Sequence, residues 1–153
     1  MFGQHFYNES TRRYVAVFGT LFNDIQIGRS DNSGKEIQRM TVPINYAPMQ
    51  KLLARLEGDP NLNKPAITLP RMSFEIMGMN YNPTRKVGSL VRQSKSITSN
   101  DNEMLNLYSP APYDIDFQLN IMTKYTEDGT KILEQILPFF KPDVTVSVKM
   151  IDS

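Results

Sequence analysis

Tyr113-Asp-Ile-Asp-Phe-Gln-Leu-Asn-Ile-Met-Thr-Lys-Tyr125, then Thr126-Glu-Asp-Gly-Thr130 and Lys131-Ile-Leu-Glu-Gln-Ile-Leu-Pro-Phe-Phe140, is the stretch that decides the fold. Its first part alternates apolar and polar residues, with a period of two that predicts a long strand. One face carries Tyr113, Ile115, Phe117, Leu119, Ile121 and Tyr125, and the other carries Asp114, Asp116, Gln118, Asn120 and Lys124. We therefore expect a strand with one apolar face and one solvated face.

The Glu-Asp-Gly cluster after this strand predicts a turn. Beyond it, Ile132, Leu133, Ile136, Leu137 and Phe140 recur at helical spacing. Pro138 lies inside this pattern and would clash with the carbonyl of Glu134, so we expect a kink or an early helix end there. The helix should pack back on the apolar face of the strand.

The rest of the chain supplies further helices and strands. Residues 10–23 and a segment that begins at Pro48 have helical apolar spacing, and Ser10 or Asn8 could cap the first helix. Strand patterns occur at 24–29, 36–44, 71–79 and 143–151, the first two forming a hairpin. The expected fold is α+β, a mixed and largely antiparallel sheet with flanking helices, in a single domain that spans residues 1–153.

Residues 80–112 contain few apolar positions and no persistent period, which predicts a long loop. So long a loop in a small domain is usually functional or disordered, and we expect this one to contact a partner. It carries a basic cluster made of Arg85, Lys86, Arg92 and Lys95. Pairing with acidic residues of a protein partner is favoured, and contact with phosphate groups of a nucleic acid is the alternative.

Composition excludes several classes of function. The chain has no cysteine, which excludes disulfides, thiolate metal sites and a cysteine nucleophile. Its formal net charge is +1, and no apolar run approaches membrane-spanning length. His5, the only histidine, has no partners placed by sequence, and Asp114 with Asp116 supplies too few oxygen ligands for a metal ion. We expect no catalytic residue, metal or cofactor.

Several short motifs, in their order and spacing, resemble a known family. They include Phe6-Tyr7-Asn8, Leu21-Phe22-Asn23, Val42-Pro43-Ile44, Met79-Asn80-Tyr81-Asn82-Pro83, Tyr108-Ser109-Pro110-Ala111-Pro112 and Glu134-Gln135-Ile136-Leu137-Pro138-Phe139-Phe140-Lys141-Pro142. Together they look like the proximal tail sheath stabiliser, or tail terminator, of T-even-type contractile-tailed phages. The resemblance runs from the first residue to about Pro142.

The resemblance implies a structural virion protein with a tail-terminator-like fold. Members of the family form a homohexameric ring that caps the tail tube and the last ring of sheath, ends tail elongation and joins the tail to neck proteins. Phage DNA would pass through the ring without specific binding. The expected partners are therefore the chain itself, the sheath, the tube and the neck proteins, in a particle assembled in the host cytoplasm. Another neck or baseplate adaptor is the alternative within this class.

Family members continue with further strands past the point that corresponds to Ser153, so the resemblance implies either a minimal version of the family or a shortened chain. A closed ring needs one patch that binds a different patch on the next subunit. Our candidate partner-binding residues are those of the basic cluster, the solvated face of the long strand and the nearby methionines, that is Asp114, Asp116, Met72, Met77 and Met79.

Overall fold

The structure is a computed structural model that describes residues 7, 9–31, 33–57, 67–88, 90, 92–96 and 104–148. Its contacts divide the chain into two compact units, residues 1–75 with 119–153 and residues 76–118. Strands β4 (Arg71–Tyr81) and β7 (Tyr113–Met122) each contribute to both units. Whether residues 1–153 form a single domain, as the sequence predicts, stays a prediction.

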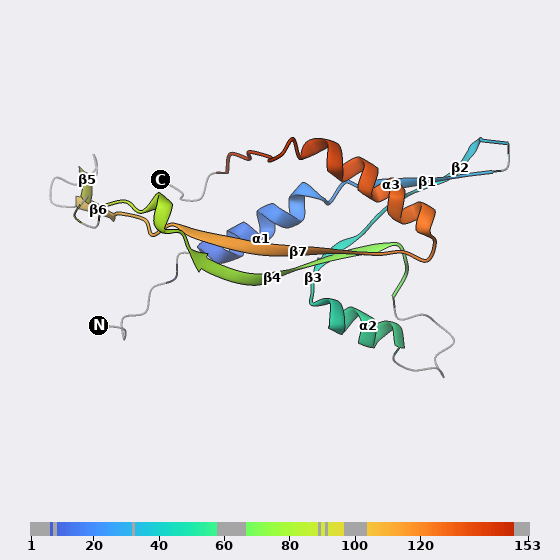
Figure 1. Ribbon diagram of the computed structural model, residues 1–153, viewed down its shortest axis with the longest axis horizontal. Helices are drawn as coiled ribbons and strands as arrows, with labels where there is room; N and C mark the ends of the chain where they lie inside the picture. The colour runs from blue at the N-terminus through green and yellow to red at the C-terminus, as the bar shows by residue number, and fades with distance from the viewer. Residues whose placement is uncertain are drawn as a thin grey trace. The chain divides into compact units, whose positions relative to one another are not determined.

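The strands form three separate sheets (Figure 1). Strands β1 (Gln26–Ser30) and β2 (Glu36–Thr41) form an antiparallel hairpin, and β3 (Ile44–Tyr46) pairs in parallel with β4 in the three-stranded order β3-β4-β7. Strands β5 (Arg92–Ser96) and β6 (Met104–Tyr108) form a second antiparallel hairpin. This mixture of parallel and antiparallel pairs, together with three helices, confirms the predicted α+β class.

In the first unit, helices cover both faces of the β3-β4-β7 sheet (Figure 1). Helices α1 (Ser10–Leu21) and α3 (Thr126–Ile136) pack on one face, and α2 (Met49–Glu57) packs on the other. The larger core holds Phe22, Ile27, Val42, Met72, Ile132 and Ile136, with Leu119 and Ile121 packed against it. A smaller core beneath α2 holds Leu52, Ile67 and Met122.

The second core overturns our expectation that one whole face of β7 is solvated. Asp114, Asp116 and Gln118 are exposed as expected, but Asn120 and Met122 on the same face are buried. The reason is α2, whose Leu52 lies against Met122 and covers this end of the strand. A period of two shows which residues share a face but not how much of that face another element covers.

The end of α3 follows the prediction. The helix stops at Ile136, and Pro138 lies in the short 3-10 helix η2 (Leu137–Phe139) that follows. The Glu-Asp-Gly cluster is not a separate turn, because α3 already begins at Thr126 and its first turn holds Glu127 and Asp128. Carboxylates in that position are favoured by the positive end of the helix dipole.

Three other expectations were wrong. Ile44 does not prolong the hairpin strand but begins β3 in another sheet. Ser10 starts α1 without a side-chain cap, since Glu9 occupies the cap position. Residues 143–148 are not in a strand, and Val144, Val146 and Val148, which we expected to face inward, are exposed.

Two methionines of β4 test the placement of the core. Met72 is 0% exposed and Met77 is 62% exposed. Met72→Ala should lower the free energy of unfolding by about 2–5 kcal/mol, because it removes a buried side chain and leaves a cavity. Met77→Ala should change it by about 0.5 kcal/mol or less, as is usual for surface positions. Urea unfolding followed by circular dichroism measures both, and equal losses of stability would contradict this core.

Candidate partner-binding surface

One face of the second unit exposes a row of methionine and tyrosine side chains. Met77, Met79 and Tyr81 alternate along β4 and therefore share a face of this strand. Strand β7 adds Tyr113, whose ring lies edge-on to the ring of Tyr81 at 5.7 Å between centroids. All four side chains are exposed. We call this set the Met–Tyr face. Methionine adapts its shape to a partner, and tyrosine is enriched at interfaces.

Cross-strand hydrogen bonds join polar side chains of the same two strands. The Asn80 side-chain amide donates to the Asp116 carboxylate at 3.0 Å, and the Asn82 amide donates to Asp114 at 2.9 Å. Asp114 and Asp116, expected to bind a partner, are thus bonded to side chains of their own chain.

Arg85 belongs to the same network. Its guanidinium forms an ion pair with the Asp114 carboxylate, so the structure brings together two residues that the sequence suggested separately. The side-chain oxygen of Asn82 accepts a hydrogen bond from the Thr84 N–H at 3.0 Å and caps the 3-10 helix η1 (Pro83–Arg85). The Asn82 N–H donates to the Pro112 carbonyl at 3.0 Å. These bonds hold together the two ends of residues 83–111, which we call the arm.

The arm differs from the unstructured loop that we expected. It contains η1, β5 and β6, and its hairpin pairs Arg92 with Tyr108 and Ser96 with Met104. The short, mostly polar strand β5 shows little apolar alternation, which is why the sequence pattern missed it. Lys86 is exposed, as expected of a partner-binding residue. The backbones of Arg92 and Lys95 lie on β5, but their side chains, like His5, lie outside the described residues.

Met72 is the one candidate that the structure removes from the surface. Its side chain belongs to the larger core, together with Ile132 and Val42. Met72 is fully buried, whereas Met77 and Met79 on the same strand are exposed. Met72 therefore stabilises the fold and does not line a binding surface.

Sequence reasoning missed an apolar groove in the first unit, at the ends of α1 and α3. It has a volume of about 240 Å³. Its lining includes Phe22, Ile25, Ile136, Phe139, Phe140 and Val144. Phe139 is 74% exposed although it is large and apolar. The pair of phenylalanines directly after Pro138 is a sequence signal for this groove, but we placed Phe140 in the helical pattern and made no assignment for Phe139.

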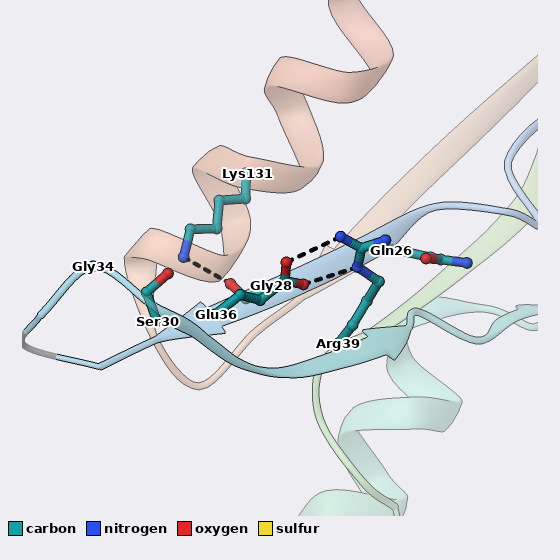
Figure 2. A pocket seen from close by; sticks show the side chains of 7 residues that line it. All are labelled: Gln26, Gly28, Ser30, Gly34, Glu36, Arg39 and Lys131. Carbon is teal, nitrogen blue, oxygen red and sulfur yellow. Dashed lines mark hydrogen bonds and ion pairs between the residues drawn. The ribbon is translucent and has the colours of Figure 1, made fainter.

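A polar hollow also lies in the first unit, between the β1–β2 hairpin and α3 (Figure 2). Two Arg39 nitrogens donate to the Glu36 carboxylate at 2.8 and 3.0 Å, and the Lys131 ammonium donates to the Gly28 carbonyl at 3.1 Å. Lys131 also pairs with Glu127 at 2.6 Å. Every charged side chain that lines the hollow is therefore paired within the chain, and its contacts fasten α3 to β1.

Within the ranges that the structure describes, no group of three or more His, Cys, Asp or Glu side chains could hold a metal ion. No helix in the described part of the chain combines the length and apolar character needed to span a bilayer.

Comparison with known proteins places the chain among phage tail proteins. Residues 5–153 match the family described as the tail sheath stabiliser of T4-like Myoviridae viruses. The chain is also 36% identical, over 150 residues, to the tail completion protein gp15 of Enterobacteria phage T4. That alignment covers 93% of this chain and 53% of the relative, so the chain spans about half the length of the curated relative.

The network at the base of the arm can be tested with a matched pair of variants. Asp114→Ala removes the partner of both Asn82 and Arg85, whereas Asp116→Ala removes a contact to Asn80 alone. The Thr84 amide should exchange about 2–10 times faster in the first variant, because a net hydrogen bond contributes about 0.5–1.5 kcal/mol. Hydrogen exchange measures this, and equal rates in the two variants would show that Asp114 does not hold the arm.

The ion pair in the polar hollow has a consequence for titration. Hydrogen bonds from Arg39 hold the pKa of the Glu36 carboxyl below its ordinary value of 4.5. The ion pair between Arg39 and Glu36 therefore stabilises the fold fully at pH values above the ordinary pKa of a glutamate. This stabilisation is lost as the pH falls through the lowered pKa of Glu36. Arg39→Ala should raise the Glu36 pKa toward 4.5, while Lys35→Ala should not, as NMR titration can show. No change with Arg39→Ala would mean that the pair does not form in solution.

Proposed function

The chain belongs to the tail sheath stabiliser family of T4-like viruses, and we propose that it forms a hexameric ring which closes the tail. The ring would cap the tail tube and the sheath, end tail elongation and connect the tail to the neck proteins. The observation that carries this proposal is the family match over residues 5–153. The chain would act as a structural virion component at the proximal end of the tail, with no enzymatic role.

The proposed mechanism is geometric. A ring bound to the tube end blocks the next tube subunit, and the same ring bound to sheath holds the extended sheath against early contraction. Six copies of a moderate interface act together, because the first contact raises the effective concentration for the others. DNA would pass through the centre of the ring without specific contacts.

The Met–Tyr face supports this proposal. Contiguous exposed apolar side chains on a soluble chain mark interaction sites. On β4 these exposed side chains follow the buried residues Met72, Ser73 and Phe74. We propose that Met77 and Met79 contact a neighbouring subunit or a tail protein. Arg85, Asp114 and Asp116 would instead orient the arm, because their charges already have partners within the chain.

The ring and the role of the Met–Tyr face can be tested together by electron microscopy. The purified protein should form closed rings, alone or on isolated tail tubes. Met77→Asp combined with Met79→Asp should reduce the number of rings or capped tubes at least about tenfold, because burying two unpaired carboxylates costs several kcal/mol. Ile37→Asp is the control, since Ile37 is 70% exposed on the other unit.

A wild-type protein that stays monomeric at high concentration and binds no tubes would refute the proposed ring. The rival function, nucleic-acid binding through the basic arm, predicts that affinity for DNA falls steeply as salt rises. Ring assembly through an apolar face should be much less sensitive to salt. DNA binding with a steep salt dependence and no tube capping would favour the rival.

A further inference from the structure

The most exposed large apolar side chain of the described chain lies on the arm. Leu90 is 93% exposed, in the segment between η1 and β5, and Val87 nearby is exposed as well. In sequence these two residues lie between Lys86 and Arg92. Covering an exposed leucine side chain stabilises a complex, so this segment has the character of an apolar anchor with basic flanks.

The apolar groove of the first unit has a matching character. Its volume of about 240 Å³ exceeds the roughly 150 Å³ of a dry cavity that holds a benzene molecule, so a leucine side chain fits. Three of its lining residues, Ile25, Gln135 and Val144, are each next in sequence to an exposed carboxylate. These carboxylates belong to Asp24, Glu134 and Asp143.

The charges around the two features are complementary. Asp24, Glu134 and Asp143 are in no ion pair of the described chain, and Lys141 is the one basic residue beside the same lining. On the arm, Lys86 is exposed and unpaired among the described residues, in contrast to Arg85. An apolar anchor flanked by cations therefore suits an apolar groove flanked by carboxylates, with the rim charges setting the orientation of binding.

We propose that the arm of one copy inserts Leu90 into the apolar groove of a second copy of this chain. The inference rests on the proposed ring and names the contact that would close it. Anchor and groove are different surfaces, so the contact is heterologous, as a cyclic assembly of six subunits requires. Leu90 would occupy the desolvated centre of the interface, with Lys86 facing the carboxylates at its edge.

The absence of native cysteines makes this contact accessible to disulfide trapping. Two single variants, Leu90→Cys on a size-tagged chain and Phe139→Cys on an untagged chain, are mixed, assembled on tail tubes and oxidised. A docked pair brings the two Cα atoms close to the 4.4–6.8 Å that a disulfide needs. The expected result is a reducible heterodimer on a gel, about ten times more abundant than in the control.

The control replaces Phe139→Cys with Ile37→Cys, which is equally accessible but lies elsewhere on the same unit. Ile37 is the extra residue of the bulge opposite Arg29 and Ser30, and Arg29 pairs with Asp128 in the first turn of α3. The groove lies at the last turn, near Ile136. Eight residues of helix separate the two places by about 12 Å.

Three outcomes would overturn the inference. One is a heterodimer yield equal to that of the control. Another is a Leu90→Cys/Phe139→Cys double variant that yields only a cross-linked monomer, since the arm would then fill its own groove. The third is a Lys86→Glu variant whose tube capping is as strong as that of the wild type.

Failure of this contact and failure of the ring can be told apart. Rings or capped tubes seen by electron microscopy without the specific cross-link would reject the arm-to-groove contact and keep the proposed function. If no ring forms and no tube is capped, the proposed function itself fails.

Discussion

The fold depends on covering both faces of the β3-β4-β7 sheet within the first unit. Leu119 and Ile121 of β7 pack against the core formed with α1 and α3, while Met122 packs against Leu52 of α2. A sheet covered on both faces is held more firmly than one with a solvated face, because more of its apolar side chains lose their contact with water. The β1–β2 hairpin also takes part in this cover, because its Ile27 belongs to the larger core.

In the second unit the same two strands carry exposed apolar side chains. Beyond Ile76, strand β4 exposes Met77, Met79 and Tyr81, and β7 adds Tyr113. Polar cross-strand bonds, such as that between Asn80 and Asp116, also link the two strands here. An apolar face can be left free for a partner when polar bonds contribute to holding the strands together.

Charge pairing distinguishes two basic residues of the arm, Arg85 and Lys86. Arg85 is occupied by Asp114 and helps to position the arm, whereas Lys86 is exposed without such a partner. A surface ion pair contributes little free energy, about 0–1 kcal/mol, so its role here is better described as geometric. In the proposed ring, an arm with a defined base would lose less conformational entropy on binding than a free loop.

The sequence by itself determined the helices, most strands, the class of the fold and the family, because local periodicity, proline positions and ordered motifs are properties of neighbouring residues. Alternation along β7 identified its faces, and Pro138 marked the end of α3. Only the tertiary structure decided that Asn120 is buried, that Arg85 meets Asp114, and that Phe139 lines a groove. Each of these depends on a segment distant in sequence, such as α2 over the end of β7. No local pattern shows which distant segment will cover a side chain or pair with its charge, because both depend on how the whole chain packs.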